Sequence, residues 1–518
     1  ARRGTGEPEF ELLDTGVFDD DNYFDVVVEY AKATPDDILM RVTVHNRGAD
    51  PARIHLLPQI VLRNTWSWSE DRRRPRLRQS GPTSIELIEP EIGCAAIRSD
   101  GHPTLLFTEN ESNAARLWGA ANEGPRFTKD AFHSYVIDGL VGLANPAMEG
   151  TKAAFLHELE VPGGGSCQVR LRLTEESNDP PFSAFDAIVA ARQAEADAFY
   201  DSLHGKLPPE ARAVQRQAYA GLIWSKQYYE FDVHRWREGD PGQPPPERRN
   251  DRDSRNADWG HFNSADVLSM PDAWEYPWFA AWDLAFHTVP LARLDPAFAK
   301  KQLDLLTREW YLHPNGQLPA YEWAFGDVNP PVHAWAALKV FQIDREQRGD
   351  KGDLAFLERV FHKLLLNFTW WVNRKDSRGK NVFQGGFLGL DNIGVFDRNQ
   401  PLDGGESLEQ ADGTGWMGMY CLNMLAIALE LARTKPAYEP IATKFFEHFI
   451  YISQAINRHC AGTGLWDDQD GFYYDALQAA DGSTRRLAIR SFVGLIPLFA
   501  VETLDPALRD AILVAAAQ

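Results

Sequence analysis

Residues 275–287 read Glu275-Tyr276-Pro277-Trp278-Phe279-Ala280-Ala281-Trp282-Asp283-Leu284-Ala285-Phe286-His287, and the rest of the chain is organised around them. Pro277 suits the first position of a helix, where no backbone N–H is needed, so we expect a buried helix over 277–294. On that helix Asp283 would lie one turn from the rings of Phe279 and Phe286. Loss of hydration among these rings would raise the pKa of its carboxyl group.

A raised carboxyl pKa is what a general acid needs near neutral pH. Asp283 is therefore a candidate catalytic residue. The alternative is a structural aspartate held by His287 or by a distant arginine, because ion-pair networks also perturb pKa values. The spacing of the residues does not separate these two interpretations.

Composition limits the classes of function. The 518 residues predict two to four domains, and a hydrophobic content of 44% predicts large cores. The net charge of −21 argues against nucleic acid and anionic membranes as partners, since both need a basic face. The sequence contains no run of 18 apolar residues, so no membrane-spanning helix is predicted.

The four cysteines, Cys94, Cys167, Cys421 and Cys460, are far apart and predict isolated buried thiols. We expect no metal and no cofactor. The chain begins without Met or a signal peptide and ends in a helical pattern, so both ends look cut from a longer protein. A cytoplasmic location is expected, and the oligomeric state is open.

Three segments are predicted. Residues 1–175 contain short β-rich runs separated by turns and predict a β-sandwich. Residues 176–207 predict a linker with a helix over about 185–203. Residues 208–518 predict an (α/α)6 barrel, a toroid of six helix pairs. It is expected to be incomplete, with C-terminal helices missing, because about nine helices are predicted where twelve are needed.

The predicted helices from residue 210 onward are 210–233, 277–294, 296–311, 330–346, 354–375, 413–434, 437–458, 489–503 and 505–518. Long loops separate many of them, at 234–276, 312–329, 376–412 and 459–488. Loops of this length in a compact domain are usually functional. In the first of these loops, Asp251 and Asp253 loosely mimic a calcium loop. Arg255 breaks the pattern, so we interpret the segment as solvated.

Several residues on these loops and the adjoining helices are candidate substrate contacts. Aromatic side chains can stack on sugar rings, and polar ones can bond hydroxyl groups. Glu322 either contacts substrate or caps a helix, Asp391 and Asn392 suit a turn equally well, and Asp412 is a plausible N-cap. The full candidate set is Phe279, Trp282, Tyr321, Glu322, Trp335, Asp391, Asn392, Asp412 and Trp416.

The order of these motifs resembles glycoside hydrolase family 63, most of all its bacterial mannosylglycerate and glucosylglycerate hydrolases. The wider clan of inverting (α/α)6 enzymes includes trehalases. The resemblance covers about 210–518 and rests on a set of motifs that is specific only in combination. They are Trp282-Asp283, Gly316-x-x-Pro319, Asn329-Pro330-Pro331, Gly389-Leu390-Asp391-Asn392 and the segment from Asp412 to Trp416.

The resemblance implies an inverting α-glycosidase acting on a glucoside or mannoside. It implies that Asp283 is the general acid and that Asp391 lines the sugar site. Inversion needs a second carboxylate to activate water, and in relatives it comes from late in the barrel. No segment before Gln518 matches it, so no base is assigned, and residues 1–518 alone are expected to hydrolyse glycosides poorly.

Two other functions compete with hydrolysis. An inverting sugar phosphorylase also pairs a β-sandwich with an (α/α)6 barrel, but no Gly-rich or basic phosphate cradle stands out in the sequence. A non-catalytic carbohydrate-binding protein is the third possibility. It would not explain why a carboxyl group, Asp283, lies among aromatic residues. In each case the expected partner is a carbohydrate.

Overall fold

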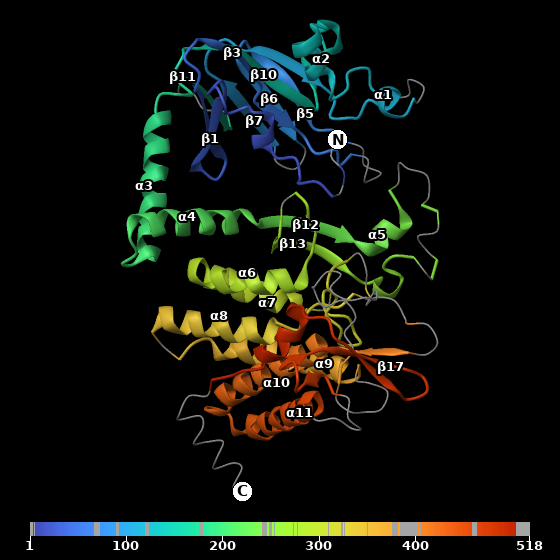
Figure 1. Ribbon diagram of the computed structural model, residues 1–518. Helices are drawn as coiled ribbons and strands as arrows, with labels where there is room; N and C mark the ends of the chain where they lie inside the picture. The colour runs from blue at the N-terminus through green and yellow to red at the C-terminus, as the bar shows by residue number, and fades with distance from the viewer. Residues whose placement is uncertain are drawn as a thin grey trace. The chain divides into compact units, whose positions relative to one another are not determined.

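The computed structural model (Figure 1) describes residues 4–503 with gaps at 5, 67–72, 90–92, 120–123, 176–179, 241–245, 248–250, 253, 273, 277, 309, 323–324, 326, 350, 375–381, 384–401, 403–405 and 458–463. The chain forms two compact units. The first covers Ala1–Ser202 with Asp240–Pro244, and the second covers Leu203–Gly239 with Pro245–Gln518.

The first unit contains two antiparallel sheets. The larger has the strand order β1-β2-β11-β7-β6-β5-β9. Buried and less buried residues alternate along β2, as expected for a strand with one face on a core. The strand bounds are β1 Phe24–Thr34, β2 Asp37–Asn46, β5 Arg76–Gly81, β6 Ser84–Glu89, β7 Gly93–Ser99, β9 Glu149–Gly150 and β11 Ser166–Thr174.

The smaller sheet is centred on β10 (Lys152–Val161), which pairs with β3 (Ala52–Leu56), β4 (Gln59–Val61) and β8 (Thr104–Thr108). The two sheets share one hydrophobic core, in which Leu77 and Ile85 of the larger sheet pack with Phe155 of the smaller. The strands β5 to β7 were not predicted. Strand β5 has a single apolar side chain, Leu77, and β7 consists largely of small residues.

Among the described residues, two α-helices lie within the first unit and a third begins in it and ends just past its boundary. They are α1 (Ala114–Trp118), α2 (Ala131–Asp138) and α3 (Phe185–His204). The start of α3 packs on the larger sheet, where Phe185 meets Leu39 in a small core. The helix predicted over 185–203 is confirmed, whereas α1 and α2 were not predicted.

The second unit begins with α4 (Pro209–Trp224), which has proline at its first position, as that position allows. The chain then forms an antiparallel pair of strands, β12 (Lys226–Asp232) and β13 (Asn263–Ser269). The helix predicted over 210–233 is therefore wrong in its last third. The short helix α5 (Val233–Glu238) and strand β13 also lie in the segment predicted as the loop 234–276.

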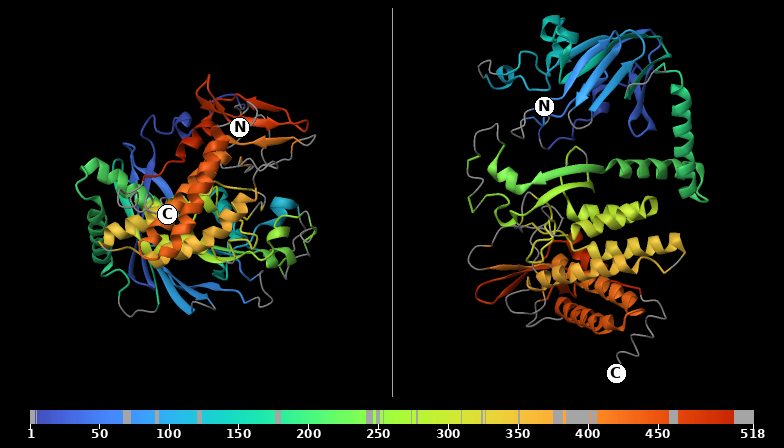
Figure 2. Two further views of the ribbon diagram at one scale, coloured as in Figure 1. Left: turned by 90° about the horizontal axis from the view of Figure 1, so that it is seen from below. Right: turned by 180° about the vertical axis from the view of Figure 1, so that it is seen from behind.

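Six helices follow and pack as neighbouring pairs (Figures 1 and 2). The pairs α6 with α7, α8 with α9 and α10 with α11 are in contact, and α8 also contacts α6 and α10. Helices α8 to α11 begin and end within three residues of their predicted ranges. The bounds are α6 Ala281–Leu294, α7 Pro296–Leu306, α8 His333–Arg348, α9 Leu354–Val372, α10 Ala411–Ala432 and α11 Glu439–Asn457.

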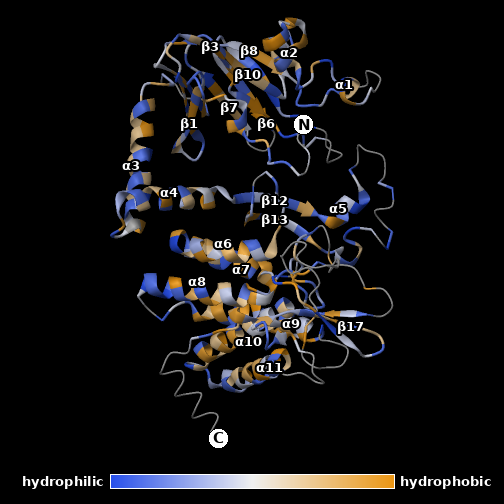
Figure 3. Ribbon diagram, in the orientation of Figure 1, coloured by the Kyte–Doolittle hydropathy of each residue, from blue (hydrophilic) through white to orange (hydrophobic). Residues whose placement is uncertain are grey.

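These helices share one core, to which α8, α9 and α10 contribute most of the buried side chains. Hydrophobic residues recur along α10 and α11 in Figure 3. Among the described residues, α10 alone has the length and apolar composition of a membrane span. However, 78% of its most apolar window is buried within the protein, which is the environment of a core helix.

The last described part of the chain differs most from the prediction. The expected loop 459–488 contains four strands, β15 (Trp466–Asp467), β16 (Phe472–Tyr473), β17 (Asp475–Gln478) and β18 (Thr484–Leu487), of which β17 also pairs with β14 (Ser407–Glu409). The expected helix 489–503 is a 3-10 helix over Phe492–Phe499 with Pro497 inside it. The helix predicted over 505–518 lies outside the described residues.

The predicted division into a β-rich first part and a helical second part is confirmed. The incomplete (α/α)6 toroid stays a prediction, as do the three domain ranges. Of the cysteines, Cys421 is buried, Cys167 is partly buried and Cys94 is exposed, so the prediction of buried thiols is wrong for Cys94. Cys460 lies outside the described residues.

Candidate active site

Asp283 lies in the first turn of α6, which begins at Ala281. This start is four residues later than predicted, and Pro277 lies outside the described residues. Burial raises the pKa of the Asp283 carboxyl above its usual value, and a backbone N–H at the helix start only partly opposes the shift. The half-buried carboxyl group therefore holds its proton more firmly than an exposed aspartate does.

His287 follows Asp283 by one helical turn. Its Nδ1 lies 2.9 Å from the hydroxyl of Ser269, and that hydroxyl lies 2.7 Å from the hydroxyl of Ser225. Burial lowers the pKa of His287 despite the nearby Asp283 carboxylate, so the imidazole is neutral at pH 7. A neutral ring forms no ion pair, which weakens the interpretation of Asp283 as an aspartate held by His287.

One backbone hydrogen bond brings two predicted parts of the site together. The N–H of Ala281 donates to the carbonyl oxygen of Ala320 over 2.8 Å. Asp283 follows the first of these residues by two positions, and Glu322 follows the second by two. Two residues of chain span about 7 Å at most, so both carboxylates lie on backbone anchored at the same point.

Glu322 is the more deeply buried carboxylate, with only 3% of its surface exposed. Burial raises its pKa to about 7, against the opposing effects of the Tyr229 hydroxyl and the Arg255 guanidinium. The Arg255 Nη2 lies 3.6 Å from Glu322 Oε1, beyond the usual length of a strong charged hydrogen bond. Glu322 therefore changes its protonation state near neutral pH.

Arg255 is held in place by aromatic rings. Its guanidinium carbon lies 5.4 Å from the centre of the Phe231 ring and 5.3 Å from that of Trp236, within the range of a cation–π contact. The side chain is 20% exposed. Asp251, in the cluster interpreted as solvated, is exposed, whereas Arg255 just after that cluster is largely buried.

The loop that carries Glu322 is tied to α9 at Gly316. Gly316 has a φ of 93°, which disfavours residues with a side chain. A Cβ atom there would lie 2.5 Å from the carbonyl oxygen of Leu366. The Asn367 side-chain amide donates to the Gly316 carbonyl over 2.9 Å. The glycine therefore lets the loop approach α9 closely enough to be fixed by it.

Trp282 and Trp335 belong to one row of aromatic rings. The ring centres of Trp282 and Phe286 are 5.5 Å apart, and those of Phe286 and Trp335 are 5.4 Å apart. Both tryptophans are partly buried, and Phe286 is exposed. The row joins α6 to α8 and leaves aromatic surface beside the helix that carries Asp283.

Phe279 and Tyr321 are placed differently from that row. Phe279 is buried in a second core, with its ring centre 5.1 Å from Tyr311 and 6.0 Å from Phe262. It has no open face for a sugar, so its position does not support the predicted substrate contact. Tyr321 is partly buried and donates its hydroxyl hydrogen bond to Asp327.

The remaining candidates lie further along the chain. Asp412 is fully buried in the first turn of α10. The N-cap of α10 is Gln410, so the prediction of Asp412 as N-cap is wrong by two positions. Trp416 is also buried, and its ring packs 5.6 Å from Phe499. Asp391 and Asn392 lie outside the described residues.

Sequence reasoning did not find Tyr229 or Arg255, the two groups beside the buried carboxylate. They come from β12 and from the segment after α5, about 70 to 90 positions before Glu322. No local spacing links residues so far apart. Within the described part of the chain, no group of three or more His, Cys, Asp or Glu side chains could hold a metal ion.

Comparison with known proteins identifies part of this region. Residues 276–390 match the model of the mannosylglycerate hydrolase MGH1-like glycoside hydrolase domain. An uncharacterized protein of Saccharomyces cerevisiae is 46% identical over 567 residues, which cover 98% of this chain and 52% of the yeast protein. The chain thus spans about half the length of this curated relative.

Solved structures give weaker likenesses. The family 63 mannosylglycerate hydrolase of Thermus thermophilus in complex with glucose is 19% identical, covers 48% of this chain and 71% of its own, and has a TM-score of 0.36. A putative kojibiose phosphorylase from the human microbiome is 10% identical, covers 86% of this chain and 54% of its own, and has a TM-score of 0.25. Likenesses this low carry no argument about function.

Proposed function

Since the chain belongs to the glycoside hydrolase family 63-like proteins through the domain matched over residues 276–390, we propose that it is an inverting α-glycosidase. Its substrate is a glucoside or mannoside, either a small glycoside or an oligosaccharide. The observation that carries this proposal is the half-buried Asp283 at the start of α6, because burial raises the pKa of its carboxyl group. Such a group suits protonation of a leaving oxygen.

In the proposed mechanism, Asp283 donates its proton to the glycosidic oxygen as the bond to the sugar breaks. Trp282 and Trp335 offer ring faces to the sugar, and Tyr321 and Glu322 bond its hydroxyl groups. Asp391 and Asn392 complete the substrate contacts, whereas Asp412 and Trp416, like Phe279, are buried and are given no direct contact with the sugar. Inversion also requires a carboxylate that activates water on the opposite face of the sugar, and we assign no residue to that role.

The proposal is tested by measuring sugar release from mannosylglycerate, glucosylglycerate and α-linked disaccharides with the full-length protein, because residues 1–518 alone are expected to hydrolyse glycosides poorly. The assay is run with and without inorganic phosphate, and the first-formed anomer is identified by NMR. Release of the β-anomer without phosphate supports an inverting α-glycosidase. Release only with phosphate would instead identify a phosphorylase, and binding without release would identify a carbohydrate-binding protein.

Asp391→Ala is expected to lower kcat/KM by about tenfold to a hundredfold, because a charged acceptor for sugar hydroxyls is worth roughly 1.5–3 kcal/mol. The measurement is steady-state kinetics on the best substrate found above. Asn399→Ala, also in the loop 376–412, is the control and should retain activity. An unchanged kcat/KM in Asp391→Ala would mean that this residue only forms a turn.

Glu322→Gln is expected to remove a pH dependence of stability. The pKa of Glu322 is about 7 in the folded protein against the ordinary value of 4.5 for a glutamate, so folding favours the protonated form. That stabilisation is complete below pH 4.5 and is lost as pH rises to about 7, a change on the order of 3 kcal/mol.

The measurement is the unfolding midpoint of both proteins at pH 5 and pH 8. The amide cannot ionise, so the variant should lose less stability than the parent between the two values. Glu275→Gln, at an exposed position, should behave like the parent. Equal losses in the parent and Glu322→Gln would show that Glu322 is ionised at both pH values.

A further inference from the structure

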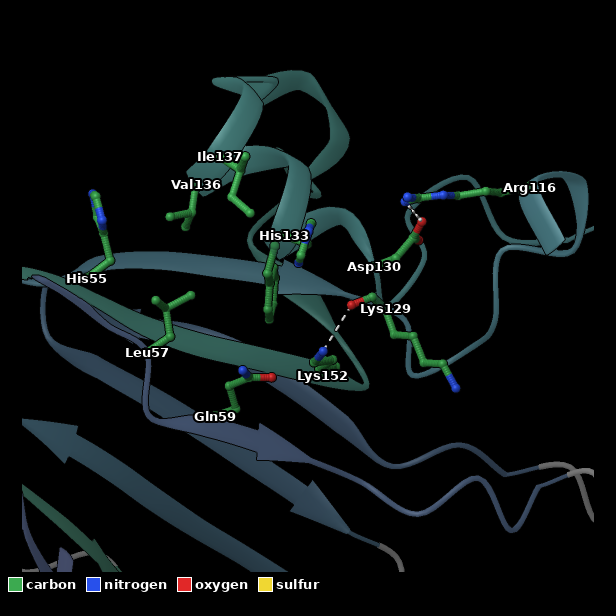
Figure 4. Close-up of a pocket in the computed structure, with 11 residues that line it drawn as sticks. His55, Leu57, Gln59, Arg116, Lys129, Asp130, His133, Val136, Ile137 and Lys152 are labelled. Carbon is green, nitrogen blue, oxygen red and sulfur yellow. Dashed lines mark hydrogen bonds and ion pairs between the residues drawn. The ribbon is translucent and has the colours of Figure 1, made fainter. Parts of the chain in front are cut away.

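The first unit contains a cleft lined by none of the candidate active-site residues. It has a volume of about 570 Å³ and is bounded by strands β3, β4 and β10 and by helix α2 (Figure 4). One wall is apolar and consists of Leu57, Phe132, Val136 and Ile137. The volume falls in the range of small-molecule sites.

The charged residues around this cleft are mostly cationic. Arg116, Lys129 and Lys152 face a single acidic residue, Asp130, in a chain whose net charge is −21. The three cationic residues are separated by 13 and 23 positions in the sequence, so they do not form a basic sequence motif. The fold therefore gathers positive charge at one place on an acidic protein.

The carboxylate of Asp130 is already occupied by donors outside the centre of the cleft. It accepts hydrogen bonds from Thr128 Oγ1 over 2.6 Å, from Asn113 Nδ2 over 3.2 Å and from Arg116 Nη1 over 3.2 Å. Burial opposes its ionisation, but these bonds hold its pKa below the usual value. Asp130 thus forms its ion pair with Arg116, while its charge still acts on Lys152 from a greater distance.

Lys152 lies at the base of the cleft on a strand paired on both sides, with β4 and with β8. Its Nζ lies 2.9 Å from the carbonyl oxygen of Lys129 and 4.8 Å from the centre of the Phe132 ring. An ammonium group has three N–H donors, and the carbonyl takes one. Among the described residues, no carboxylate forms an ion pair with Lys152.

Polar side chains complete the lining. His55, Gln59 and His133 border the cleft, and within the described part of the chain none of these side chains makes a hydrogen bond to another residue. Figure 4 shows the Lys152 ammonium beside the backbone of Lys129, while the Lys129 side chain extends away from it. The cleft thus combines one fixed ammonium group, hydrogen-bonding groups and an apolar wall.

We propose that this cleft binds a small anionic sugar, with its phosphate or carboxylate paired with Lys152 and its ring against the apolar wall. The three unoccupied side chains bond the sugar hydroxyls. A neutral sugar would leave the Lys152 ammonium group without an anion, and a purely hydrophobic ligand would cover that partly buried group without giving it a hydrogen-bond acceptor. The proposal does not depend on hydrolysis in the second unit.

The test is calorimetric titration of the full chain at low ionic strength with glucose 6-phosphate, glucuronate and glucose. Binding of either anionic sugar with a Kd below about 10 mM, and tighter than binding of glucose, supports the proposal. Whichever of the two anionic sugars binds more tightly shows whether the cleft prefers a phosphate or a carboxylate. Lys152→Gln should weaken that binding by about tenfold to a hundredfold, because a charge-assisted hydrogen bond is lost.

A second variant guards against a failure to fold. Gln59→Glu adds a negative charge at an exposed position of β4 and should abolish binding of the anionic sugar. Lys32→Gln, at an exposed position of β1, removes the same charge elsewhere in the unit and should bind like the parent. The proposal is overturned if neither anionic sugar binds, or if glucose binds as tightly as they do. It is also overturned if Gln59→Glu keeps the parental affinity, or if Lys32→Gln loses as much affinity as Lys152→Gln.

Discussion

In the full-length protein, Asp283→Asn is expected to slow hydrolysis of the natural glycoside by at least about 10²-fold, the lower limit for removal of a general acid. The asparagine side chain has nearly the same shape as aspartate but has no acidic proton to give. Because burial raises the pKa of the Asp283 carboxyl, the parent retains that proton to higher pH than an exposed aspartate would. The measurement is kcat/KM in the assay that first detects sugar release.

The dependence on the leaving group separates acid catalysis from a general loss of structure. An aryl glycoside with a good leaving group needs little protonation, so Asp283→Asn should affect it much less than the natural substrate. Glu275→Gln, at an exposed position eight residues earlier, is the matched control and should keep parental activity. Parental rates for Asp283→Asn on the natural substrate would rule out the assigned role.

Phe279→Ala is expected to destabilise the second unit by about 3–5 kcal/mol, the usual cost of removing a buried aromatic side chain. Phe279 is 1% exposed and packs with Trp259, Phe262 and Tyr311. Its removal would leave a cavity in the core beside the start of α6. The measurement is urea unfolding followed by tryptophan fluorescence, with separate fits for the transitions of the two units.

A matched control lies five residues earlier. Trp274 is larger than Phe279 but is 92% exposed, so Trp274→Ala should change stability by less than about 0.5 kcal/mol. Equal destabilisation by the two substitutions would show that burial of Phe279 is not what stabilises this region. A small effect of Phe279→Ala alone would show that the core closes around the missing ring.

The helical second unit could be predicted because its helices carry long periodic apolar patterns. Leu354–Val372 and Ala411–Ala432 contain enough regularly spaced apolar residues for the pattern to outweigh local exceptions. The strands β1, β2, β10 and β11 were predicted for the same reason. Strands β5 and β7 were not, since β5 has a single apolar side chain and β7 consists largely of small residues. Strand β6 between them was missed as well.

The start of α6 shows the limit of local signals. Proline is compatible with a first helical position, but here the helix begins four residues after Pro277. The residues between them are Trp278, Phe279 and Ala280, and Phe279 is drawn into a separate aromatic core. Packing against distant residues thus decides where the helix starts.

The sequence by itself determined the type of each unit, the family-like order of motifs and the choice of Asp283 as a candidate acid. Only the tertiary structure placed Tyr229 and Arg255 beside Glu322, and Lys152 over Phe132 in a cationic cleft. The periodicity of apolar residues and the spacing of motifs in the sequence indicate which residues are neighbours within one helix or strand. A pKa depends on burial and on charges brought together from distant elements, and those are decided by the folded packing.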